Sequence, residues 1–99
     1  MSCMGESEDV QISVNKVVID SLKPKDLPLV ELSRSLCNID GVHAVNIIVT
    51  EVDARTETIK ITLEGSNIDY DAIPKVMERC GAVIRSIDEI NITKSARKR

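Results

Sequence analysis

Apolar and polar residues alternate strictly over residues 58–64. Ile59, Ile61 and Leu63 occupy every second position, and the positions between them are polar. A period of two is typical of a strand that has one side against a core and the other side in water. The sequence therefore predicts a strand here, with these three side chains on its inner side.

Three other segments lack such clean alternation but are rich in Val and Ile, whose branched side chains favour extended backbone. They are residues 12–22, 42–52 and 82–93. The polar connection at 53–56 is short, so it predicts a hairpin with the alternating segment. We thus expect four strands.

Two segments repeat apolar residues at helical spacing. The first stripe is Leu29, Leu32, Leu36 and Ile39, and the second is Ile73, Val76, Met77 and Cys80. Asp26 is a suitable N-cap for the first helix, and Asp69 or Asp71 for the second. Gly41 and Gly81 are expected to end the two helices.

The order of these elements is β-α-β-β-α-β. Two right-handed crossovers place both helices on one face of a four-stranded antiparallel sheet with strand order 4-1-3-2. This α+β arrangement is a ferredoxin-like sandwich. It is expected over residues 10–93 as a single domain, between a flexible acidic tail at 1–9 and a flexible basic tail at 94–99.

The first strand is apolar on both sides, which an antiparallel sheet with one wet face does not need. Four side chains are expected to point away from the helices and to form an apolar patch. They are Val14, Val18, Ile48 and Val52. An exposed apolar patch favours a partner, so we expect a second copy of the chain to cover it.

The composition excludes several classes of protein. No segment approaches the roughly 20 apolar residues of a membrane span, and the chain starts without an apolar export segment, so a cytoplasmic location is expected. Tyr70 is the single aromatic residue and the net charge is −3, so nucleic-acid binding is not expected. The high Ile and charge content favours a heat-adapted source.

Catalytic and soft-metal chemistry also lack their usual residues. Cys3, Cys37 and Cys80 form no C-x-x-C pair, and His43 is the only histidine. We expect Cys37 and Cys80 to be buried, reduced thiols that pack as small apolar side chains. The alternative is a redox role for Cys3 in the N-terminal tail. No nucleophile–base pair or glycine-rich phosphate loop is present, so no enzyme activity and no cofactor are expected.

The remaining candidate site is the pole where the first strand ends, the hairpin turns and the last strand begins. Asp20, Glu51 and Asp53 are candidate oxygen ligands for Ca²⁺ or Mg²⁺. Lys23 and Arg85 are candidates for holding an anionic small molecule. The alternative is a solvated cluster of charges that pair with one another.

Five groups of segments resemble, in the same order, those of one small archaeal family. They are Val17-Val18-Ile19-Asp20-Ser21-Leu22-Lys23-Pro24; Gly41-Val42 with Val45-Asn46-Ile47; Glu51-Val52-Asp53 with Thr56-Glu57; Ile59-Lys60-Ile61-Thr62-Leu63-Glu64-Gly65 with Ile68-Asp69; and Ser86-Ile87-Asp88-Glu89. Over about residues 12–92 the chain resembles domain of unknown function 211. The resemblance implies a ferredoxin-like protomer, homo-oligomeric rings and no established reaction.

The chain departs from the family pattern before the Ser-Ile-Asp segment. Gly81-Ala82 and Arg85 stand where a glycine pair and a histidine are expected, so no role of that histidine is carried over. The function expected from the sequence is that of a non-enzymatic, ring-forming homo-oligomer without a membrane partner. The alternative is a regulatory or sensor domain that binds a small ligand or a divalent cation at the charged pole.

Overall fold

The structure is a computed structural model that describes residues 10–96. Its elements are β1 (Val10–Pro24), α1 (Leu29–Cys37), β2 (Val42–Val52), β3 (Thr56–Gly65), α2 (Ala72–Arg79) and β4 (Val83–Ala96). β4 continues past its predicted end at Thr93 into the segment expected to be a basic tail. The predictions for residues 1–9 and 97–99 lie outside the described residues.

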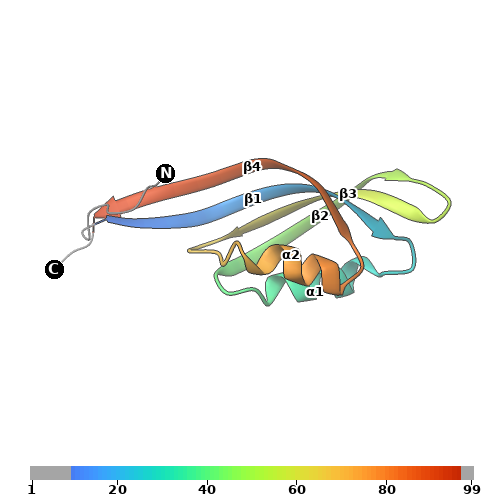
Figure 1. Ribbon diagram of the computed structural model, residues 1–99, viewed down its shortest axis with the longest axis horizontal. Helices are drawn as coiled ribbons and strands as arrows, with labels where there is room; N and C mark the ends of the chain where they lie inside the picture. The colour runs from blue at the N-terminus through green and yellow to red at the C-terminus, as the bar shows by residue number, and fades with distance from the viewer. Residues whose placement is uncertain (1–9, 97–99) are drawn as a thin grey trace.

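The four strands form one antiparallel sheet in the order β2-β3-β1-β4, as predicted. Both helices cover the same face of this sheet (Figure 1). The ferredoxin-like α+β fold expected from the sequence is confirmed. Within residues 10–96 neither helix is long and apolar enough to cross a membrane.

The core lies between the helices and the two central strands. Ile59, Ile61 and Leu63 of β3 are fully buried, as their alternation predicts, and pack with buried side chains of β1 and both helices. Complete burial of each such side chain stabilises the fold by about 1.5–3 kcal/mol. The helix-facing side of the sheet is therefore the main source of stability.

The first helix starts differently from the prediction, whereas the second has Asp71 as its N-cap, one of the two residues predicted. Pro28, rather than Asp26, is the N-cap of α1, and Asp71 caps α2 without a side-chain hydrogen bond. The end of α2 agrees with the prediction: Gly81 has φ +82° and donates its N–H to Glu78 O, while Ala82 N–H donates to Met77 O. This pair of bonds is the Schellman motif, which turns the chain sharply into β4.

A bulge at Asn15 changes which side of β1 each residue occupies. The pairing with β4 jumps from Val14↔Ile92 to Lys16↔Asn91. One extra residue reverses the alternation, so Val14 points to the helix side and packs against the core, whereas Lys16 lies on the outer face. The prediction that Val14 and Val18 share the outer face is thus wrong.

A second register shift occurs in β2 between Val49 and Glu51. Ile48 lies opposite Lys60 on the outer face, but Val52 lies opposite Glu57, which is on the helix-facing side of the hairpin extension. Val52 therefore does not join Ile48 on the outer face, contrary to the prediction. At both bulges one extra residue reverses the alternation of sides, so a strict period of two assigns the residues beyond the bulge to the wrong face.

The ends of β1 and β4 form a two-stranded ribbon that continues beyond the helices and the other two strands (Figure 1). We call residues 10–14 and 92–96 the β1/β4 ribbon; they remain paired from Val14↔Ile92 to Val10↔Ala96. The ribbon contributes to a longest dimension of 54 Å, against 26 and 21 Å for the other two. Neither helix covers the ribbon.

Candidate functional site

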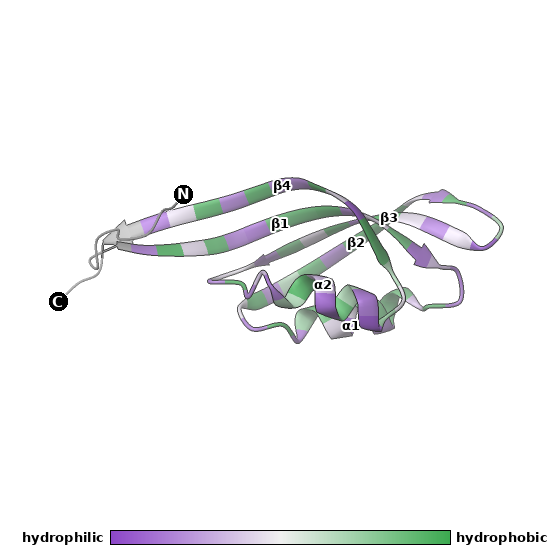
Figure 2. Cartoon of the chain, in the orientation of Figure 1, coloured by the Kyte–Doolittle hydropathy of each residue, from purple (hydrophilic) through white to green (hydrophobic). Residues whose placement is uncertain are grey.

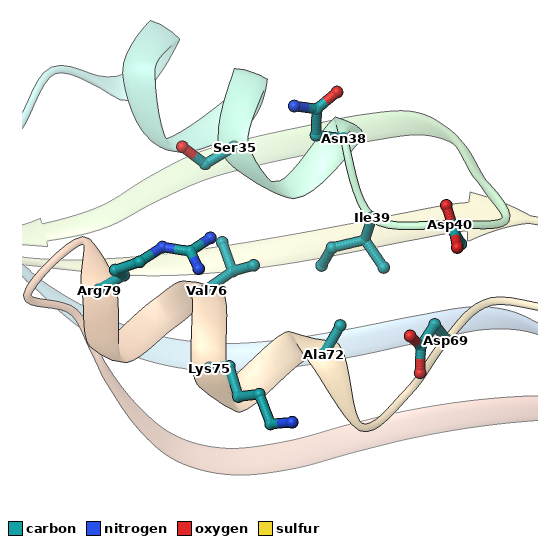
Figure 3. Close-up of a pocket in the computed structure, with 9 residues that line it drawn as sticks. All are labelled: Ser35, Asn38, Ile39, Asp40, Asp69, Ala72, Lys75, Val76 and Arg79. Atoms are coloured by element: carbon teal, nitrogen blue, oxygen red, sulfur yellow. The ribbon is translucent and has the colours of Figure 1, made fainter.

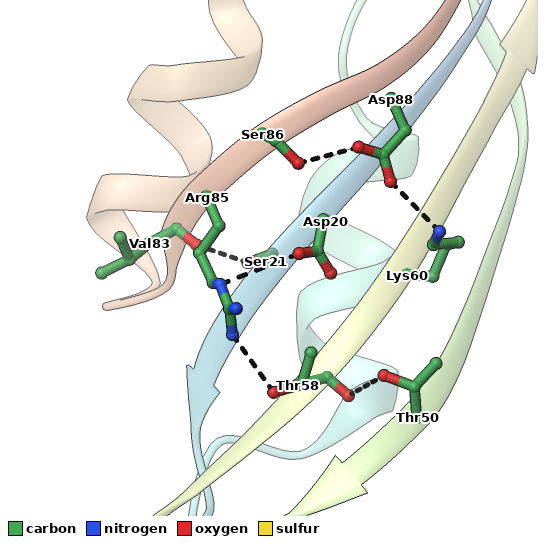
Figure 4. A network of polar contacts seen from close by, with 9 residues as sticks. All are labelled: Asp20, Ser21, Thr50, Thr58, Lys60, Val83, Arg85, Ser86 and Asp88. Carbon is green, nitrogen blue, oxygen red and sulfur yellow. Dashed lines mark hydrogen bonds and ion pairs between the residues drawn. The ribbon is translucent and has the colours of Figure 1, made fainter.

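The outer face of β1, β3 and β4 carries a network of charged side chains (Figure 4). Lys60 Nζ lies 3.1 Å from Asp88 Oδ2, and Ser86 Oγ donates to Asp88 Oδ1 at 2.8 Å. The Ser86 hydroxyl, followed by Lys60, lowers the pKa of Asp88 below its ordinary value of 3.8. These exposed contacts satisfy the charges within the chain.

This network replaces the apolar patch that the sequence predicts. Val18 points outward but is only 9% exposed, and Ile48, on the neighbouring outer surface, is 55% exposed. With Val14 and Val52 on the helix side, the four predicted interface residues do not form one surface. On β1, β3 and β4 the exposed part of the outer face is mainly charged and paired within the chain, while Ile48 on β2 is an isolated exposed apolar side chain.

The three predicted cation ligands are not brought together. Asp20 lies 3.7 Å from Arg85 Nε and is paired in register with Lys60, whereas Glu51 lies opposite Thr58 beyond the β2 bulge. Asp53 is at the hairpin turn, where its N–H donates to Thr56 O. Among the described residues, no three His, Cys, Asp or Glu side chains are arranged to hold a metal ion.

Lys23, a predicted anion ligand, is only 2% exposed. Its Nζ lies 2.7 Å from Glu57 Oε1 and donates to Pro24 O at 3.1 Å and Leu27 O at 2.8 Å. The three donors of the ammonium group are therefore used inside the protein. Lys23 anchors the chain that leaves β1 and has no donor left for an anion.

The other predicted anion ligand, Arg85, is also engaged. Its Nη1 donates to Thr58 Oγ1 at 3.4 Å while its Nε faces Asp20 (Figure 4). Nearby, Lys25 Nζ donates to Asp53 O at 3.1 Å and ties the hairpin to the end of β1. The end of β1, the hairpin and the start of β4 lie together at one pole, as predicted. The charged side chains there mainly link these three segments to one another.

An apolar surface lies instead on the helix-facing side of β4 and the ribbon. Four isoleucines there are unusually exposed, and we call them the ribbon stripe: Ile12, Ile87, Ile90 and Ile92. Ile90 is paired with Val17 and Ile87 with Ile19, both on the helix side. Apolar residues also recur along both strands of the ribbon (Figure 2). β4 is also an edge strand, with β1 as its one neighbour in the sheet.

A second apolar surface lies at the opposite edge of the sheet, between α1 and β2. This groove has a volume of about 480 Å³, and Leu29, Val30 and Ile47 provide much of its apolar wall. We call it the α1/β2 groove. Cys37 and His43 also line it, and Cys37 is exposed, contrary to the prediction of a buried thiol.

Comparisons with known proteins agree with the resemblance seen in the sequence. The model of the DUF211 family, described as uncharacterised ArCR, matches residues 15–96. An uncharacterised protein from Methanocaldococcus jannaschii is 38% identical over 77 residues, which cover 78% of this chain and 79% of that protein.

Proposed function

The chain belongs to the DUF211 family, and on this premise we propose that it is a non-enzymatic protein that assembles with copies of itself into a closed ring. The observation that carries the proposal is the pair of apolar surfaces on opposite edges of one sheet. A contact between two different surfaces repeats from copy to copy, and such a head-to-tail contact closes into a ring when the rotation permits.

The ribbon stripe is the first of the two surfaces. Ile90 and Ile92 are 42% and 49% exposed; no helix lies over the ribbon, which contains Ile92 and begins just after Ile90. Covering the exposed half of each isoleucine would contribute on the order of 1 kcal/mol. An uncovered edge strand also offers unpaired backbone groups along β4, which favours a protein partner.

The α1/β2 groove is the second surface and is the counterpart that we propose. It is concave and partly apolar, whereas the ribbon protrudes. The groove and the ribbon lie at the β2 and β4 edges, so one copy can offer its ribbon to a neighbour and accept another ribbon at its own groove. This arrangement supports a closed assembly rather than a simple two-fold dimer.

The remaining parts of the proposal rest on smaller observations. The free thiols Cys37 and Cys80 suit a reducing compartment, which supports a cytoplasmic location. The outer face combines both signs of charge and has no aromatic side chain to stack a base, which supports the absence of a nucleic-acid partner. Heat adaptation remains part of the proposal because of the abundant isoleucine.

A sensor for a small ligand or divalent cation at the charged pole is the alternative function, and it has less support. Lys23 and Arg85 are engaged within the chain, and Asp20, Glu51 and Asp53 are not gathered. We therefore favour assembly over sensing.

Native mass spectrometry of the full chain tests the assembly. We expect a particle that is a fixed multiple of the 10.9 kDa protomer over a wide concentration range. Ile90→Glu/Ile92→Glu and Val30→Glu should each give monomers. Ile48→Glu is the matched control, because Ile48 has a similar exposed fraction, 55%, but lies on the outer face. A 10.9 kDa particle for the unmodified chain at high concentration would overturn the proposal.

Mixing the two monomeric variants tests the head-to-tail geometry. Ile90→Glu/Ile92→Glu keeps an intact groove and Val30→Glu keeps an intact ribbon, so an equal mixture should form a one-to-one heterodimer and nothing larger. If β4 instead pairs with β4 of a second copy, Val30→Glu alone would still dimerise. That result would exclude the groove as the counterpart.

A further inference from the structure

The ribbon has a strand edge without a neighbour, on the side of β1 that faces away from β4 (Figure 1). β3 pairs with β1 only from Lys16 onward, so residues 10–14 have β4 as their one neighbouring strand. The loop after β3 reaches the last of these residues, where Ile68 N–H donates to Val14 O at 2.9 Å. The edge is therefore open at residues 10–12, which we call the free β1 edge. The groove between α1 and α2, by contrast, is lined mainly by polar and charged side chains and has no comparable set of unpaired backbone groups (Figure 3).

The contact at Val14 shows which backbone groups point out of this edge. In an antiparallel pair, successive residues turn their N–H and C=O groups alternately toward the partner strand and away from it. Because Val14 O faces the loop, the backbone groups of Val14 point away from β4, and those of Ile12 and Val10 do the same. The bulge at Asn15 lies beyond this stretch and does not interrupt the period. Val10 and Ile12 thus each present one N–H and one C=O that have no partner among the described residues.

The sequence of this edge lacks the features that protect a strand edge. Exposed edges usually carry charged residues or proline, which discourage pairing with another chain. Residues 10–15, Val-Gln-Ile-Ser-Val-Asn, contain neither and are rich in β-branched side chains. A two-stranded ribbon is also only marginally stable by itself. Both observations favour a further strand along the free β1 edge.

We propose that this strand is the same segment of a second copy, antiparallel to the first across a two-fold axis between the two Gln11 residues, and that the contact joins two rings. In this register Ile12 of each copy lies opposite Val10 of the other, and the two residues exchange both hydrogen bonds. All the free groups of the two edges are then paired. A two-fold axis at Ile12 would instead make the second copy compete with Ile68 for Val14 O.

One ribbon can make this contact and the ring contact together. The ribbon stripe lies on a face of the ribbon, whereas the N–H and C=O groups of the free β1 edge lie in the plane of the sheet. The two-fold axis gives a four-stranded sheet in the order β4-β1-β1-β4, with both stripes on the same face. The edge contact therefore leaves the stripes available to the α1/β2 grooves.

The edge contact rests on the ring proposed above, because one contact alone is weak. A few hydrogen bonds do not offset the rotational and translational freedom that two separate chains lose. The variants that break the ring are therefore still expected to be monomers. In a ring the edges are presented together, so each contact after the first forms within one complex. Two-fold axes combined with a ring give a closed assembly of two rings.

Val10→Pro tests the pairing, and Val10→Ala is its matched control. Proline removes the N–H and places a ring carbon where the second copy would lie, and it is tolerated at the first residue of an edge strand. In native mass spectrometry of the full chain, the unmodified protein and Val10→Ala should have twice the particle mass of Val10→Pro.

The outcomes separate this contact from the ring. A ring whose mass is the same in Val10→Pro and in the unmodified protein would overturn the edge contact and leave the ring intact. Half the mass in Val10→Ala as well would also overturn it, because the side chain and not the backbone would then be responsible. A 10.9 kDa particle for the unmodified chain would overturn both proposals.

Charges at Gln11 test the register. Side chains directly opposite in an antiparallel pair are about 5 Å apart, so Gln11→Glu or Gln11→Lys brings like charges together and should halve the particle mass. An equal mixture of the two variants should recover the full mass, because each Glu then faces a Lys. Thr93→Glu is the matched control, since it adds a charge to the same face of the ribbon but on β4, and it should keep the full mass. Full mass for Gln11→Glu alone, or half mass for the mixture, would overturn the proposal.

Discussion

The sheet beneath the helices and the ribbon beyond them are built from the same β-branched side chains but differ in burial. Ile61 of β3 is fully buried, whereas Ile92 of β4 is 49% exposed. Both positions lie on the helix-facing side of one antiparallel sheet. The difference shows that β-branched residues favour the extended backbone in both regions, whereas the position of the helices decides which of their side chains are buried.

The largest effect that separates the two regions should come from truncating their isoleucines. Ile61→Ala removes fully buried atoms and leaves a cavity, so we expect a loss of about 2–5 kcal/mol in the free energy of unfolding. Ile92→Ala should cost less than about 1 kcal/mol when both are measured by urea unfolding on the Val30→Glu background, in which we expect the proposed assembly to be disrupted. Equal losses would mean that the ribbon belongs to the same cooperative core.

The next largest effect should come from the polar anchor on the helix-facing side. Lys23→Met removes an ion pair with Glu57 and leaves two carbonyl oxygens without a donor, so we expect a loss of about 2 kcal/mol. Lys25→Met is the matched control, because Lys25 is exposed and makes one side-chain hydrogen bond; its cost should stay within about 0.5 kcal/mol. Thermal unfolding followed by circular dichroism would measure both, and similar midpoints for the two variants would contradict the anchoring role.

The smallest effect should come from the outer face. The folded-state pKa of Asp88 is lowered by Ser86 and Lys60, so the stability contributed by this carboxylate is present above its unfolded value, near 3.8. That contribution is lost as the pH falls through the lower folded pKa. Asp88→Asn should therefore flatten the decrease in unfolding midpoint below about pH 4, while Asp26→Asn, at an exposed position outside the network, should not. An unchanged slope in Asp88→Asn would show that the pair contributes nothing.

Much of the fold follows from short-range patterns. The alternation at Ile59, Ile61 and Leu63 predicts one face of β3 correctly, and the element order predicts the strand order. Gly81 ends α2 because a glycine reaches φ +82° without strain. These features depend on neighbouring residues or on general rules of chain connection, so a single sequence contains them.

The candidate site was harder to predict because it depends on where strands bulge and end. Alternation carried through Asn15 places Val14 on the wrong side, and the shift before Glu51 does the same for Val52. Lys23 was missed because its charge suggested a solvent-exposed strand end, although the period of two continues inward through Ile19 and Ser21. That period was the one signal in the sequence for its burial.

Because of the bulge at Asn15, the number of residues in β1 decides which side of the ribbon its N-terminal residues occupy. Every residue of β1 N-terminal to it owes its side of the ribbon to one additional residue, so an insertion or deletion between Ile12 and Val17 would turn Ile12 away from the helix side and bring its polar neighbours there, whereas the stripe isoleucines of β4 would keep their side. At the hairpin tip around Ala54, a change in length would leave these sides unaltered. Changes in length should therefore be tolerated at the tip and should be costly within this short stretch of β1.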